Sequence, residues 1–194
     1  VHPSPNKKNS YFFSNNRYIE KEVLNKGWNY IYINNSVGND YIKSSLQSKY
    51  IKFLQFLEDF PKFKNRIIIY HDHKIKIDDR SLNKIKTLIN NNLNKSVIIT
   101  KEVYKYNWKT KVNIYDEINA AMSQPRYKKN MHKTKKFVDE MVQSGRISST
   151  VRICNTGLLI YINYNNIKEL IKSVYDKYIK HQQPECQMYW RVFT

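Results

Sequence analysis

Short apolar runs alternate along the chain with longer segments whose apolar residues recur at helical spacing. Runs rich in Ile, Val and Tyr predict strands at 11–13, 28–33, 66–70, 74–78, 97–100, 151–153 and 158–162. Helices are predicted over 17–26, 44–60, 79–90, 114–122, 128–143 and 166–179. This alternation predicts an α/β fold with a mixed, mostly parallel central sheet and helices on both faces.

The length favours one domain over 1–194, and the hydrophobic share of 41% is adequate for its core. The chain begins at Val1 and stops inside an apolar run, which predicts a domain cut from a longer multidomain polypeptide. No run approaches the ~18 apolar residues that cross a bilayer, and none resembles a signal peptide. Cys154 and Cys186 have neither metal-type spacing nor a disulfide framework. We therefore expect a cytoplasmic protein without a membrane anchor.

The formal net charge of +18, from 34 Lys and Arg against 16 Asp and Glu, suggests nucleic acid as a partner. However, the charge is spread along the whole chain, and the dominant Lys, Asn, Ile and Tyr all have A/T-rich codons. A skewed genome raises the lysine count without any phosphate contact. The same field also attracts a small anion such as a nucleotide sugar.

Ligands of open α/β sheets bind beyond the carboxyl ends of the strands. The most apolar predicted strand runs directly into His71, Asp72 and His73. A carboxylate there suits Mg²⁺ or Mn²⁺, and imidazole favours Mn²⁺ or Zn²⁺. Such a cation could bridge two phosphates and neutralise a leaving group. The alternative is an Asp that caps a turn between two exposed His.

Three further features have both a functional and a structural interpretation. Lys49 and Lys52 share one helical face, which could meet a diphosphate or simply be solvated. The turn 155–157 offers amide and hydroxyl groups that suit sugar hydroxyls or the turn itself. Glu185 lies in the only cluster of candidate ligands or catalytic groups near the end of the chain, and could be a base, a nucleophile or structural.

Several enzyme classes are excluded by missing motifs. The sequence contains no Gly-rich phosphate loop of the Walker or dinucleotide kind. It also lacks the Gly-x-Ser-x-Gly elbow, His-Glu-x-x-His and paired Cys-x-x-Cys. Most P-loop, Rossmann-cofactor, hydrolase and zincin interpretations are therefore removed.

A series of segments resembles one known family. The segments are a helix with spaced basic residues at 47–52, a strand ending in a single Asp at 69–77, a Tyr-x-Glu helix start at 112–118, a turn and strand at 154–160, and 185–187. In this order they resemble a GT-A type glycosyltransferase, closest to the domains of plant pollen and mucilage enzymes and their bacterial counterparts. The chain departs from that pattern at His73, where Gly is usual, and at Cys186, where an acid is usual.

The resemblance implies a nucleotide-diphospho-sugar transferase fold in which Asp72 and His73 hold Mn²⁺ or Mg²⁺ on the donor diphosphate. It implies Glu185 and Asp72 as catalytic residues. The donor-binding residues that it implies are Lys49, Lys52, His71, His73, Asn155 and Thr156.

The expected reaction moves a hexose or deoxyhexose, such as glucose or rhamnose, from a UDP-sugar to a glycan or glycoprotein. The Lys- and Asn-rich composition is also similar to that of glycosyltransferases of large algal viruses, which decorate their capsid protein. That similarity implies a virus-encoded enzyme in the host-cell cytoplasm.

Two other classes stay open. A basic nucleic-acid-binding module predicts binding that weakens steeply with salt and needs no divalent metal. A metal-dependent nuclease usually needs several clustered acids. In sequence, only Asp78 and Asp79 lie near Asp72, and Asp79 is expected to start a helix.

Overall fold

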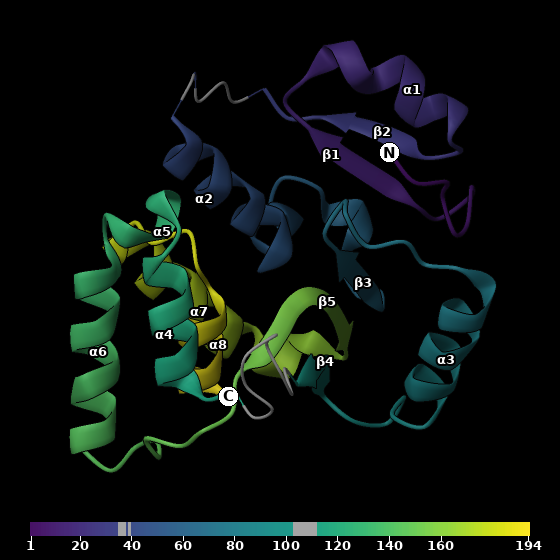
Figure 1. Ribbon diagram of the computed structural model, residues 1–194. Helices are drawn as coiled ribbons and strands as arrows, with labels where there is room; N and C mark the ends of the chain where they lie inside the picture. The colour runs from purple at the N-terminus through teal and green to yellow at the C-terminus, as the bar shows by residue number, and fades with distance from the viewer. Residues whose placement is uncertain (35–37, 39, 103–111) are drawn as a thin grey trace.

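The computed structural model describes residues 1–34, 38, 40–102 and 112–194 (Figure 1). The strands are β1 (Tyr11–Ser14), β2 (Asn29–Tyr32), β3 (Ile68–His71), β4 (Val97–Glu102) and β5 (Cys154–Ile162). The helices are α1 (Glu20–Asn25), α2 (Tyr41–Lys52), α3 (Asp79–Asn90), α4 (Ile114–Met122), α5 (Pro125–Lys128), α6 (Met131–Gln143), α7 (Lys168–His181) and α8 (Gln187–Phe193). None of the helices in these ranges is long and apolar enough to cross a membrane.

The strands form two small sheets. β1 and β2 pair in parallel, whereas β5 lies between β3 and β4 and is antiparallel to both. The α/β class is confirmed, but the described sheets do not confirm a mostly parallel central sheet. The physical reason is that β5 is the longest described strand and almost entirely buried, so it needs a neighbour at each edge. It therefore takes the place between β3 and β4.

Helices cover both faces of the three-stranded sheet, as predicted. Side chains alternate along β5, so that Leu159 and Tyr161 join the main core while Ile160 and Ile162 join a smaller one. The smaller core is completed by Ile85 of α3. The main core lies on the opposite face, where Figure 1 shows α4, α6, α7 and α8 grouped together.

Stacked aromatic rings join the end of α2, and also α6, to the C-terminal helix α8. The rings of Phe53 and Trp190 lie 5.7 Å apart at 22°, and those of Phe137 and Tyr189 lie 5.8 Å apart at 14°. Trp190 and Tyr189 belong to α8, which the sequence did not predict because its pattern is short and almost wholly apolar. The burial of α8 holds the segment just before it against the sheet.

Two predicted elements near the strand ends differ from the structure. The helix expected over 44–60 ends at Lys52, because Leu54 adopts a left-handed conformation with φ of 59°. The strand expected over 74–78 is absent. Its last residue, Asp78, instead caps α3 by accepting a hydrogen bond of 2.8 Å from the backbone N–H of Ser81.

Other predicted boundaries agree closely with the structure. The helices predicted at 79–90 and 114–122 coincide with α3 and α4. The segment 155–157 is not a turn between two strands but the first part of β5. A register shift between β4 and β5 near Lys101 accommodates it.

Candidate functional site

Polar side chains gather where β3 ends and β5 begins. Asp72 follows β3 directly, and its backbone N–H donates to the carbonyl of Gly157 in β5 at 2.8 Å. A Cβ on Gly157 would lie only 2.9 Å from Asn155 Oδ1 and 3.3 Å from Asp72 Oδ2. Glycine at this position therefore lets the Asp72 carboxylate lie against the start of β5.

The end of α2 brings a buried ammonium group to this carboxylate. Lys52 is the last residue of α2, its side chain is 3% exposed, and its Nζ lies 3.4 Å from Asp72 Oδ1. The same Nζ lies 5.1 Å from the centroid of the Tyr70 ring. The backbone carbonyl of Lys52 accepts a hydrogen bond of 2.6 Å from the hydroxyl of Tyr161 in β5. Lys52 is therefore fixed at both its backbone and its side chain.

The ammonium group of Lys52 remains charged although it is buried. Burial alone would lower the pKa of Lys52, because the charged form loses its hydration. The neighbouring Cys186, Asp72 and Glu185 more than offset this effect, so the pKa lies above its ordinary value. The fold thus keeps a fixed positive charge beside the strand end.

A second donor reaches the same oxygen of Asp72. The hydroxyl of Tyr70 donates to Asp72 Oδ1 at 2.6 Å. Burial, followed by the charge of Asp72, raises the pKa of Tyr70 well above its ordinary value, so the phenol keeps its proton. The Asp72 side chain is nevertheless 43% exposed. Asp72 Oδ1 therefore has two protein donors while the carboxylate still reaches solvent.

The segment before α8 closes one side of the group. Thr156 Oγ1 and Cys186 Sγ lie 3.2 Å apart, and Cys186 Sγ lies 4.0 Å from the Nζ of Lys52. Both Thr156 and Cys186 are buried. The first residues of β5 and the end of α2 are thereby joined to the C-terminal part of the chain.

Two buried carboxyl groups lie at the other end of the group. The backbone N–H of Gln187 donates to Glu185 Oε1 at 2.8 Å, and its side-chain amide donates to Glu117 Oε1 at 3.0 Å. Burial, and then the nearby Glu185, raises the pKa of Glu117 to about 8. Glu117 Oε2 and Gln187 Oε1 are buried without a hydrogen-bond partner. Glu117 is therefore mostly protonated at neutral pH.

We call the whole group the polar cluster, and it combines predicted and unpredicted residues. The predicted members are Lys52, Asp72, Thr156 and Glu185. The members that sequence reasoning did not assign to the site are Tyr70, Glu117, Cys186 and Gln187. The segments 69–77, 112–118 and 185–187 were quoted for the family resemblance, and that resemblance was the available signal for all four.

The two predicted histidines do not join the polar cluster. The ring of His71 lies 5.6 Å from that of Trp28, and burial lowers the pKa of His71, so the ring is neutral. His73 is exposed in the turn that follows β3. Side chains of successive strand residues point to opposite faces, which explains why Tyr70 and not His71 lies beside Lys52.

Lys49 and Asn155 lie next to members of the polar cluster. Lys49 precedes Lys52 by one turn of α2 and is buried. Asn155 is exposed, and its Oδ1 accepts a hydrogen bond of 2.7 Å from the backbone N–H of Gly157. The side chain of Asn155 therefore shapes the start of β5.

The donors around Asp72 do not fit the predicted divalent metal. Within the described ranges, no group of three or more His, Cys, Asp or Glu side chains is placed to hold a metal ion. Asp72 supplies one carboxylate, and its Oδ1 is already contacted by the ammonium of Lys52 and the hydroxyl of Tyr70. A divalent cation on that carboxylate would stand close to the ammonium and be repelled by it. The predicted Mn²⁺ or Mg²⁺ stays a prediction.

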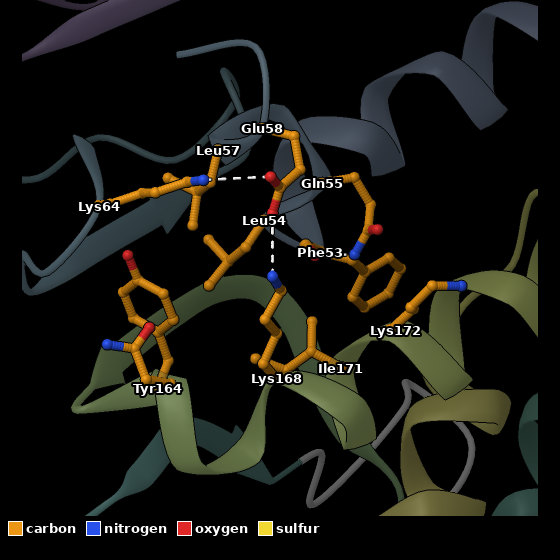
Figure 2. Close-up of a pocket in the computed structure, with 11 residues that line it drawn as sticks. Phe53, Leu54, Gln55, Leu57, Glu58, Lys64, Tyr164, Lys168, Ile171 and Lys172 are labelled. Carbon is orange, nitrogen blue, oxygen red and sulfur yellow. Dashed lines mark hydrogen bonds and ion pairs between the residues drawn. The ribbon is translucent and has the colours of Figure 1, made fainter. Parts of the chain in front are cut away.

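A small cavity of about 100 Å³ lies nearby but is separate from the polar cluster (Figure 2). It is lined by Phe53, Leu54, Gln55, Leu57, Glu58, Lys64, Tyr164, Asn165, Lys168, Ile171 and Lys172. Glu58 spans its rim through ion pairs of 3.1 Å to Lys64 and 2.9 Å to Lys168. The one carboxylate among these lining residues is held by two lysines and the remaining lining is largely apolar, so the cavity presents no set of convergent catalytic groups.

No family model, curated protein or solved structure matches this chain. A function is therefore inferred from the residues of the polar cluster.

Proposed function

We propose that the chain transfers a sugar from a nucleoside-diphosphate donor, within a GT-A-like fold. One observation carries the proposal: residues chosen for this chemistry from four distant segments lie in one polar cluster. These residues are Lys52, Asp72, Thr156 and Glu185. Four of the eight residues predicted for the site thus meet, whereas His71 and His73 do not join them.

The donor diphosphate is bound by positive charge at the end of α2. Lys52 stays charged in a site of low exposure, where a charge-assisted hydrogen bond to phosphate is strong. Lys49 adds a second positive charge one turn earlier. Asn155, which is exposed at the start of β5, faces the sugar. The strand ends thus orient the donor and the helix end holds its phosphates.

The reaction exchanges one bond at the anomeric carbon. The acceptor hydroxyl oxygen forms a bond to that carbon as its bond to the phosphate oxygen breaks, and the bonding electrons leave with the diphosphate. Lys52 stabilises the negative charge that develops on this leaving group. The proton of the acceptor hydroxyl passes to the carboxylate of Glu185. Glu117 is protonated at neutral pH and therefore cannot accept this proton, so Glu185 is the acceptor.

The finer features of the donor and acceptor come from the sequence. The proposal includes a UDP-linked hexose or deoxyhexose, a glycan or glycoprotein acceptor and a cytoplasmic location. Its support is the family resemblance together with the arrangement of the polar cluster.

Glu185→Gln tests the assignment of the proton acceptor. The amide keeps the shape of the side chain but cannot accept a proton, so sugar transfer should fall by about a hundredfold or more while nucleotide binding is retained. The measurement is UDP release from UDP-sugars with a glycan acceptor. Glu169→Gln, an exposed change of the same kind on α7, is the matched control and should leave the rate unchanged. An unchanged rate in Glu185→Gln would remove Glu185 from the reaction.

The donor class is tested by thermal-shift titration with UDP, GDP and their sugars, each with and without Mn²⁺. Stabilisation by one nucleotide family supports transfer. Stabilisation by oligonucleotides alone, decreasing steeply with salt, would favour a nucleic-acid-binding module instead.

A further inference from the structure

Two proton donors of the polar cluster converge on a single anionic oxygen. The ammonium of Lys52 lies 3.4 Å from Asp72 Oδ1, and the hydroxyl of Tyr70 donates to the same atom at 2.6 Å. An ammonium and a hydroxyl that meet on one oxygen are also a suitable arrangement for a phosphate oxygen.

The donors are fixed, whereas the oxygen that they hold can leave. Lys52 is 3% exposed and its carbonyl is held by Tyr161, and Tyr70 is half-buried within β3. Asp72 lies just beyond the strand, and its side chain is 43% exposed. Rotation of the Asp72 side chain into water would therefore uncover both donors without moving the backbone.

The position of the ammonium also bears on the metal. A carboxylate-bound Mg²⁺ or Mn²⁺ lies roughly 2.0–2.2 Å from its oxygen, so a metal on Asp72 would share the surroundings of Oδ1 with Lys52. Two cations so close compete for one carboxylate. The fold has already placed a positive charge where a metal would serve the diphosphate.

We propose that Lys52, in place of a divalent metal, binds the donor diphosphate together with Tyr70, and that Asp72 is the resident counter-ion that the diphosphate displaces. This proposal rests on the proposed function for the identity of the ligand. It makes nucleotide binding insensitive to chelators. It also makes Asp72 a competitor of the ligand, whereas a metal site would make Asp72 essential for binding.

The test is calorimetric titration of the protein with inorganic pyrophosphate and with UDP, in EDTA and in Mn²⁺. The parent should bind each ligand as tightly in EDTA as in Mn²⁺. Lys52→Met should weaken binding by about tenfold to a hundredfold, since a charged donor is lost. Asp72→Asn should bind at least as tightly as the parent. Lys43→Met, an exposed change on the same helix, is the matched control and should bind like the parent.

Each outcome separates this inference from the proposed function. Binding that requires Mn²⁺ and disappears in Asp72→Asn overturns the inference and leaves the transferase proposal standing. Binding of pyrophosphate in EDTA that depends on Lys52, without binding of any nucleotide or nucleotide sugar, supports the anion site and overturns the transferase proposal. No binding by the parent under either condition overturns both. Circular dichroism and melting of each variant establish that a loss of binding is not a loss of fold.

Discussion

The two ends of the polar cluster hold acidic side chains in opposite surroundings. Asp72 has a buried ammonium 3.4 Å away, a phenol that donates to it and access to water. Glu117 is buried, lies close enough to Glu185 for its pKa to respond, and receives one donor from the amide of Gln187. One end therefore stabilises a negative charge, and the other disfavours it.

This difference assigns different chemistry to the two ends. A fixed cation suits the binding of an anionic leaving group, whereas a carboxyl group whose pKa is raised, as that of Glu117 is, suits proton transfer together with a neighbouring carboxyl group. The same residue type thus acts in two ways because its neighbours differ.

The largest expected effect contrasts the two members of the ion pair. Asp72→Asn leaves a buried ammonium without its counter-ion and should lower the free energy of unfolding by roughly 2–3 kcal/mol. Lys52→Met leaves the partly exposed carboxylate of Asp72 without its partner and should lower the free energy of unfolding by only about 1 kcal/mol. Urea unfolding at pH 7 measures both. A larger loss in Lys52→Met than in Asp72→Asn would show that the pair is held by packing of the lysine and not by charge.

An effect that depends on pH is expected from Glu117→Gln. The folded chain raises the pKa of Glu117 from 4.5 to about 8, so it binds a proton that the unfolded chain releases between these values. The contribution of protonated Glu117 to the free energy of unfolding is therefore fully present below about pH 4.5. It is lost as the pH rises to about 8. Glu117→Gln should have nearly the same free energy of unfolding as the parent at pH 5 and a clearly higher one at pH 8.5.

The measurement is urea unfolding of the two proteins across this pH range. A difference that does not change with pH would mean that Glu117 is ionised in the folded chain, and the contrast between the two ends would vanish.

The smallest effect is expected from His73→Ala. The side chain is exposed in the turn after β3 and does not join the polar cluster. The free energy of unfolding should therefore change by less than about 0.5 kcal/mol. UDP affinity in Mn²⁺ should also stay within about twofold of the parent. Calorimetry of the variant checks this. A clear loss of Mn²⁺-dependent affinity for UDP would instead support His73 as a metal ligand.

The sequence predicts much of the cluster because strand ends and helix faces are local features. Asp72 follows an apolar run, and Lys49 and Lys52 are three residues apart in a helical pattern. The alternation of side chains along β3 also predicts that Tyr70 and His71 face opposite ways. That rule alone does not say which of the two faces Lys52, and the contact between Lys52 and Tyr70 comes from the structure.

The remaining parts depend on contacts between distant residues. Lys52 and Cys186 are 134 positions apart, and Glu117 meets Gln187 across 70 positions. No periodic pattern contains such a pairing. The central place of β5 is likewise a choice between strand partners, which the sequence of one strand does not determine. The short, almost uniformly apolar α8 offers no amphipathic pattern, although its burial positions Glu185 and Cys186.

The hydrogen bond from Tyr161 to the carbonyl of Lys52 fixes the end of α2 against the sheet. Carbonyls at the end of a helix lack partners in the next turn, and this one is tied to the middle strand at 2.6 Å. The phenol acts as a spacer of fixed length between helix and sheet. Tyr161 therefore sets the distance between the end of α2 and the middle strand, so shortening this side chain should displace Lys52 relative to Asp72.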